Sequence, residues 1–117
     1  MLEEKAKELG RLIGQSSEYQ TLKRSSEALN EDREAVKLLQ EMERLRGEAQ
    51  DMIQRGENPT PEMEKQLDDM LEKIQIQPAY QRAVSSQENF DKIMMRVNQW
   101  IMDGMKKGSA SPIITLS

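Results

Sequence analysis

Apolar residues recur three or four positions apart along almost the whole of this 117-residue chain, and this spacing limits its fold more than any other feature. In an α-helix such residues share one face, because the helix has about 3.6 residues per turn. The spacing predicts five helices, at about 2–14, 17–29, 33–55, 61–75 and 78–103. A short apolar run at 113–116 has a strand-like pattern, but it is too isolated to define a sheet.

Residues with known capping preferences stand where these helices are expected to begin and end. Asp32 and Thr60 precede two of them and suit the N-cap position, where a side-chain oxygen accepts a backbone N–H. Ser17 and Gln20 have the spacing of a capping box for the second helix. Gly56 is expected to end the third helix. These signals support the boundaries that the apolar spacing predicts.

The connections predict how the helices are arranged. The turn at 56–60 is short, so the third and fourth helices are expected to form an antiparallel hairpin. The fifth helix either folds back along the fourth or packs beside the third, and it is expected to end near Gly104. We therefore predict an all-α fold at 1–105, an antiparallel bundle of about five helices with two long helices, and a C-terminal tail at 106–117. The tail is either a flexible end or a segment that docks on a neighbouring molecule.

The composition indicates that one copy of this fold has a thin core. Hydrophobic residues make up 36% of the chain and aromatic residues 3%, so the core is built from Leu, Ile, Met, Val and Ala. Long helix pairs with so little apolar material leave parts of their stripes exposed unless a second copy covers them. We therefore expect a homodimer formed through the third and fifth helices. The predicted partner or dimer interface consists of Leu38, Met42, Leu45, Phe90, Met94, Val97, Trp100 and Ile101.

Two residues of the fifth helix each have two interpretations. Gln87 interrupts the apolar stripe, where it either fixes the register of a contact, as a buried Asn does in coiled coils, or lies hydrated at the edge. Trp100 lies beside the stripe and is either part of the core or an anchor for a partner protein. The spacing leaves both pairs of alternatives open.

The chain contains no Cys and no His, and this restricts its chemistry. Disulfides, thiolate and imidazole metal ligands, Cys nucleophiles and His-assisted catalysis are excluded. Carboxylates such as Asp68, Asp69 and Glu72 are interpreted as a solvated face with ion pairs four residues apart, although a carboxylate-only Mg²⁺ or Ca²⁺ site stays open. We expect no catalytic residues, no cofactor and no metal, and therefore no enzyme.

Charge and hydropathy bear on partners and location. There are 17 Lys and Arg against 21 Asp and Glu, and the basic residues are scattered, so direct nucleic-acid binding is not expected. The N-terminus is charged and lacks the apolar segment of a secretory signal, and no run of 18 apolar residues predicts a membrane span. These features favour a cytoplasmic protein.

Several short segments resemble one known family in their order and spacing. They are SSEYQ at 16–20, NEDRE at 30–34, GENPTPE at 56–62, PAY at 78–80, QENF at 87–90 and VNQWI at 97–101. Together they resemble the YlbF/YmcA (YheA-like) family of small helical bacterial proteins over about 2–105. The resemblance implies an all-α, self-associating protein. It also implies complexes with paralogues and another protein that influence RNA processing, competence, sporulation and biofilm formation.

Members of such complexes can carry cysteines tied to an iron–sulfur cluster. Because this chain has no Cys, the cluster is not carried over. The function we predict is a non-catalytic helical protein–protein interaction module, a regulatory adaptor in RNA processing or developmental control. The alternatives are a chaperone-like or structural helical hairpin and a nucleic-acid-associated regulator.

Overall fold

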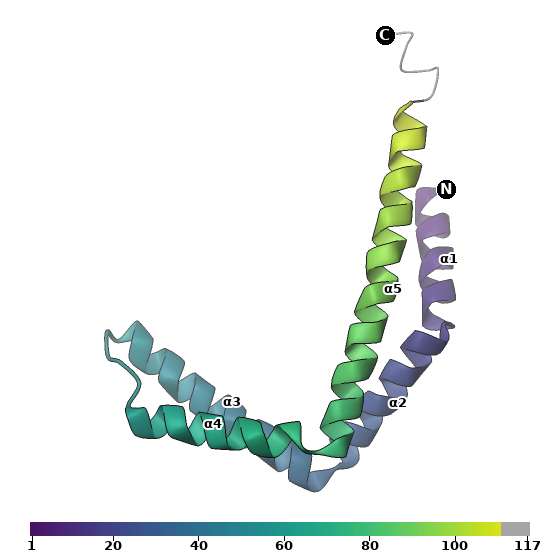
Figure 1. Ribbon diagram of the computed structural model, residues 1–117. Coiled ribbons are helices and arrows are strands. Elements are labelled where there is room, and N and C mark those ends of the chain that lie inside the picture. Colours follow the sequence, from purple (N-terminus) through teal and green to yellow (C-terminus); the bar gives the residue numbers. More distant parts are fainter. Residues whose placement is uncertain (111–117) are drawn as a thin grey trace.

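A computed structural model describes residues 1–110, and within them the chain is helical without any strand. The five helices are α1 (Leu2–Gly14), α2 (Ser17–Glu31), α3 (Arg33–Gln54), α4 (Pro61–Gln75) and α5 (Pro78–Ser109) (Figure 1). The all-α prediction and the number of helices are therefore confirmed. The apolar run at 113–116 lies outside the described residues.

Side chains cap three of the helices at their N-termini. The Asp32 carboxylate accepts the Ala35 N–H at 3.1 Å, and the Thr60 hydroxyl accepts the Met63 N–H at 3.2 Å, as predicted. The cap of α2 is Ser16 instead of Ser17, because the Ser16 hydroxyl accepts the Tyr19 N–H at 3.2 Å. The predicted capping box is absent from this described segment, since the Gln20 amide donates to the carbonyl of Gly14.

The predicted α3–α4 hairpin is confirmed, and Gly56 makes its turn. Gly56 has φ +81°, in the left-handed region where a side chain is strained. The Glu57 N–H donates to the Met52 carbonyl at 2.8 Å, and the Gly56 N–H donates to the Ile53 carbonyl at 3.0 Å. These two bonds satisfy the last carbonyls of α3 and reverse the chain.

The fifth helix continues to Ser109, so its predicted end near Gly104 is wrong. One glycine inside a helix costs only about 1 kcal/mol relative to alanine, which does not stop a long helix. Lys106 and Lys107 in the last turn also interact favourably with the helix dipole. The helix is therefore about 48 Å long at about 1.5 Å per residue, and residues 106–109, assigned to the tail, are helical.

The helices form two arms instead of one closed bundle (Figure 1). The hairpin arm consists of α3 and α4, and the long arm consists of α2 antiparallel to α5, with α1 continuing beyond α2. The expected packing of the fifth helix on the fourth or third is wrong, because α4 already covers the apolar face of α3 and α5 pairs with α2. The radius of gyration is 21.6 Å, against about 13 Å for a compact domain of this length.

The buried apolar residues are few, and the largest cluster lies where the arms meet, which we call the elbow. Ala35, Met42 and Ile74 are buried there. The long arm is held by a seam in which the Ser25 and Ser86 hydroxyl oxygens lie 2.7 Å apart. Ser86 also donates to the Arg82 carbonyl, so Ser25 is the donor of the pair. Small polar side chains therefore meet at this point of the contact between α2 and α5.

Candidate functional site

The first candidate surface is on α1, an amphipathic helix whose apolar face is only partly covered, since Leu9 and Ile13 are half-buried and Leu2 is exposed. Leu2, Ala6, Leu9 and Ile13 share that face by their spacing. Against the described part of the chain, no residue of α1 is buried, and Leu2 is 85% exposed. A helix of this length is marginal in water without tertiary packing. A further contact would therefore stabilise α1.

The last turns of α5 lie at the same end of the long arm as the N-terminus (Figure 1), and several of their apolar side chains are exposed. Trp100 and Ile101 follow the buried Val97 by three and four positions, so they continue the face of α5 that packs toward α2. Trp100 is 64% exposed and Ile101 is 44% exposed. We call Leu2, Leu9, Trp100 and Ile101 the distal face. It lies at the free end of the long arm, where contacts within the chain cover the apolar side chains only in part.

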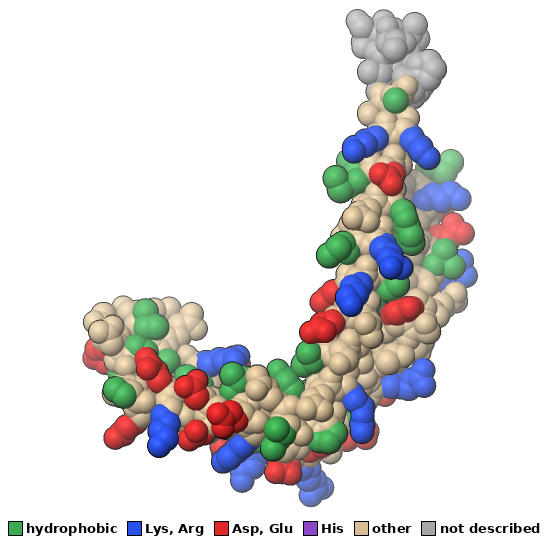
Figure 2. All heavy atoms as spheres, in the orientation of Figure 1, with side chains coloured by type: hydrophobic (Ala, Val, Ile, Leu, Met, Phe, Trp, Pro, Cys, Tyr) green, Lys and Arg blue, Asp and Glu red, His purple; other side chains and the backbone are tan. Residues whose placement is uncertain are grey.

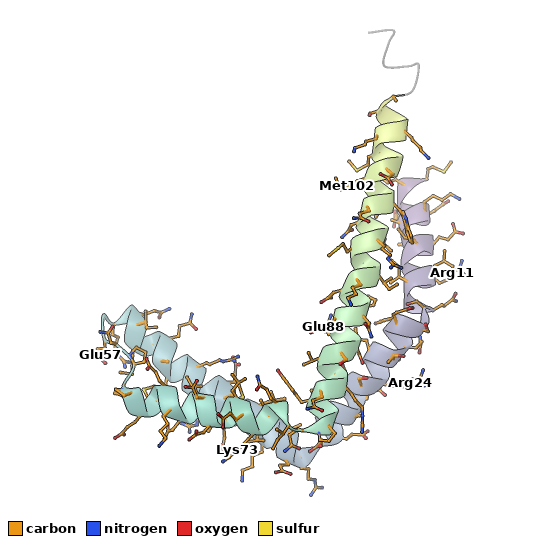
Figure 3. All side chains as sticks on the ribbon, in the orientation of Figure 1. Arg11, Arg24, Glu57, Lys73, Glu88 and Met102 are labelled. Carbon is orange, nitrogen blue, oxygen red and sulfur yellow. The ribbon has the colours of Figure 1, made fainter. Side chains whose placement is uncertain are left out.

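A second apolar stripe lies on the opposite side of α5. Val84, Met95 and Met102 are 37%, 62% and 58% exposed, and their spacing places them on one face, nearly half a turn from Val97. Figure 3 shows Glu88 and Met102 on the side of α5 that faces the open space between the arms. Hydrophobic side chains line the same edge in Figure 2. We call Val84, Met95 and Met102 the inner stripe.

The eight residues predicted to form an interface are divided by the fold, and the three on α3 lie on the hairpin arm. Met42 and Leu45 are 5% and 4% exposed, and Leu38 packs against the elbow cluster. These side chains already pack against other residues of the same chain.

The other five predicted residues lie along one side of α5. Val97 is buried, Met94 is half-buried, and Phe90 packs against Tyr19 of α2 with ring centroids 5.5 Å apart. Trp100 and Ile101 remain as the exposed pair, so the interpretation of Trp100 as a residue of the chain's own core is wrong.

Gln87 lies at the hydrated edge of the stripe. It is exposed, and its amide donates to the Asp91 carboxylate at 2.9 Å. The interpretation in which Gln87 fixes register inside a contact is therefore wrong within this chain. The inner stripe was missed by the sequence reasoning, which assigned one stripe to each helix. The signal that could have found it is the spacing of 11 and 7 residues between Val84, Met95 and Met102.

Polar groups beside the α2–α5 seam line an open groove of about 510 Å³. Thr21, Arg82 and Asn89 are part of its lining, together with the paired Ser25 and Ser86. In residues 1–110, acidic side chains are nowhere grouped closely enough to hold a metal ion. Over the same residues, no helix combines the length and the apolar character needed to cross a membrane. The surfaces described above offer apolar contact and hydrogen bonding.

Residues 2–106 match the family model described as control of competence regulator ComK, YlbF/YmcA. A UPF0342 protein of Streptococcus mutans is 34% identical over 83 residues, which are 71% of this chain and 74% of that protein. A UPF0342 protein of Streptococcus gordonii is 34% identical over 70 residues, which are 60% of this chain and 62% of that protein. A UPF0342 protein of Desulfitobacterium hafniense is 26% identical over 95 residues, which are 81% and 72% of the two chains.

Among solved structures, the chain is similar to a chain in the crystal structure of Bacillus subtilis RicA in complex with RicF. The TM-score is 0.79 over 92% of this chain and 95% of that chain. The sequence identity is 17%, so this likeness shows a shared fold.

Proposed function

The chain belongs to the YlbF/YmcA family, and on that basis we propose that it is a non-catalytic, cytoplasmic interaction module. It binds other helical proteins through the distal face and serves as an adaptor in a regulatory complex. Competence control, which the family description names, and RNA processing are the processes in which we place it. The contact is of the helix-on-helix kind, in which an apolar face is covered by the apolar face of another helix.

This proposal rests mainly on α1, because its sequence has an apolar face that its surroundings do not bury. The helix has an apolar face, and yet the described chain buries none of its residues. Burying one large apolar side chain fully is worth roughly 1.5–3 kcal/mol. Covering Leu2 and Trp100 together would therefore contribute several kcal/mol to an association. Trp is also among the residues that most often dominate interface energies.

The solved structure with the same fold supports a protein as the partner. That solved structure is a complex of RicA with RicF, so a chain of this fold can assemble with another protein. We therefore propose paralogues of the YlbF/YmcA family from the same genome as the first partners to examine.

The test compares two substitutions at exposed sites. Trp100→Asp places a charge in the distal face, and Ile76→Asp makes a similar change at a residue that is 72% exposed at the elbow. Binding of each purified paralogue is measured by calorimetry, with circular dichroism to confirm that the helices persist. We expect Trp100→Asp to weaken binding roughly 30-fold or more, as for an interface hot spot. Ile76→Asp should bind like the wild type.

Two results would contradict this assignment. One is paralogue binding that Trp100→Asp leaves unchanged. The other is an equal loss for both substitutions, because such a loss would reflect general charge or folding effects.

We also propose that the chain self-associates, as the exposed apolar stripes of the long arm suggest. The buried Met42, Leu45 and Val97 are unsuited to such a contact. Sedimentation equilibrium should then give a mass that rises with concentration from 13.5 kDa toward twice that value. A mass that stays at 13.5 kDa at every concentration would contradict self-association.

A further inference from the structure

Charged residues flank the two methionines of the inner stripe in a symmetric order. Asp91 precedes Met95 by four residues, and Lys106 follows Met102 by four residues. All four residues are exposed. The spacings of about one helical turn keep each charge on the same side of α5 as its methionine. From the elbow toward the tip of the long arm, this side of α5 therefore presents Val84, an acidic residue, two methionines and a basic residue.

We propose that two copies of this chain pair through their inner stripes, with the two α5 helices antiparallel about a two-fold axis. In this arrangement Met95 of each copy contacts Met102 of the other. Because the spacings are equal, Asp91 of each copy then faces Lys106 of the other. A two-fold contact uses the same patch on both copies, so each favourable pair occurs twice.

The charges select the antiparallel direction. A parallel pairing would place Asp91 opposite the Asp91 of the second copy, and Lys106 opposite its Lys106. Like charges that face each other destabilise a contact and suppress that arrangement. Methionine is well suited to the middle of the pairing, because its flexible side chain fills irregular gaps.

The shape of the molecule accommodates the second copy. The inner stripe faces the open space between the arms (Figure 3), so the second α5 lies in that space. The hairpin arm of each copy then extends past the tip of the other long arm. The last turn of α5 is basic through Lys106 and Lys107. Helix α4 carries more acidic than basic residues and shows a row of acidic side chains (Figure 2). This arrangement rests on the proposed self-association and specifies its geometry.

Charge reversal on two separate copies tests the arrangement. A copy with Asp91→Lys has a lysine on both sides of the methionine pair, and a copy with Lys106→Asp has an aspartate on both sides. Each variant alone should self-associate roughly 10-fold or more weakly than the wild type, because two attractive pairs become repulsive. An equimolar mixture should recover wild-type association, because both pairs are attractive again. Sedimentation at fixed ionic strength measures the three samples.

Arg24→Asp is the matched control, since it changes the net charge as Lys106→Asp does. Arg24 lies on the outer side of the long arm (Figure 3). We expect it to self-associate like the wild type. Circular dichroism confirms that each variant stays helical.

Cross-linking gives a second, independent measurement. The chain has no Cys, so single substitutions give unambiguous products with a short bismaleimide. A mixture of Met95→Cys and Met102→Cys should cross-link faster than either variant alone.

The outcomes separate the geometry from self-association itself. A wild-type chain that is monomeric throughout would overturn both. A dimer that neither charge reversal weakens would overturn the pairing and leave self-association intact. Met95→Cys alone giving the fastest cross-linking would also overturn the pairing. The stripe could instead bind another protein or unfolded chains. In that case Met95→Asp will abolish that binding while the mass of the dimer stays unchanged. This result would also overturn the pairing.

Discussion

Replacing Ile74 by alanine should strongly destabilise the elbow, because this side chain is completely buried. The substitution removes three carbon atoms from an apolar environment, which costs about 2.4 kcal/mol at about 0.8 kcal/mol per carbon. The cavity left among Ala35, Met42 and the surrounding side chains adds to this cost. We therefore expect Ile74→Ala to lower the free energy of unfolding by about 3–4 kcal/mol.

Ile76→Ala is the matched control for Ile74→Ala. Ile76 is only two residues away, but it is 72% exposed. The same three carbons are then largely in water already, and the expected loss is about 0.7 kcal/mol or less.

Urea unfolding followed by circular dichroism, at one fixed protein concentration, compares the two variants. With a slope of about 2 kcal/mol per molar urea, Ile74→Ala should lower the midpoint by about 1.5–2 M, and Ile76→Ala by less than about 0.4 M. Similar shifts for both variants would refute the packing of the elbow described above. An unchanged midpoint for Ile74→Ala would refute it as well.

Other expected outcomes concern the turn, the caps and the ionic contacts. Gly56→Ala should destabilise the chain by about 1–2 kcal/mol, because φ +81° strains a side chain, whereas Gly104→Ala should stabilise it by up to about 1 kcal/mol. Thermal melts of the two variants should therefore shift in opposite directions. Asp32→Ala removes the cap of α3 and should cost about 0.5–2 kcal/mol in urea unfolding. Raising the salt concentration from 50 mM to 1 M should weaken self-association, because salt screens the charge pairs. The binding of apolar partners at the distal face should stay nearly unchanged. Calorimetry at the two salt concentrations measures both effects.

The positions of the helices could be predicted from the sequence because the signals are local. Asp32, Thr60 and Gly56 act on the backbone within a few residues of themselves, and their effects do not depend on how the helices are arranged. The end of α5 was missed for a related reason. Gly104 is unfavourable in a helix, but the favourable residues after it outweigh its cost.

The arrangement of the helices could not be predicted, because apolar stripes of similar composition fit several partners. The contact between α2 and α5 includes a close approach of Ser25 and Ser86, which no helical spacing reveals. For the same reason the sequence could not separate residues used within the chain from residues left exposed. Met42 and Ile101 both lie on predicted apolar stripes, and only the fold shows that the first is buried and the second exposed.

Hydrogen exchange of the α1 amides most directly tests whether another protein molecule covers the apolar face of α1 at the end of the long arm. In a dilute chain without a partner, these amides should exchange much faster than those at the centre of α5, because α1 buries no residue against the described chain. Adding a paralogue that binds the distal face should slow them at least tenfold. Slow exchange of α1 in the dilute chain, or fast exchange that persists in the complex, would show that α1 is not the contact surface described here.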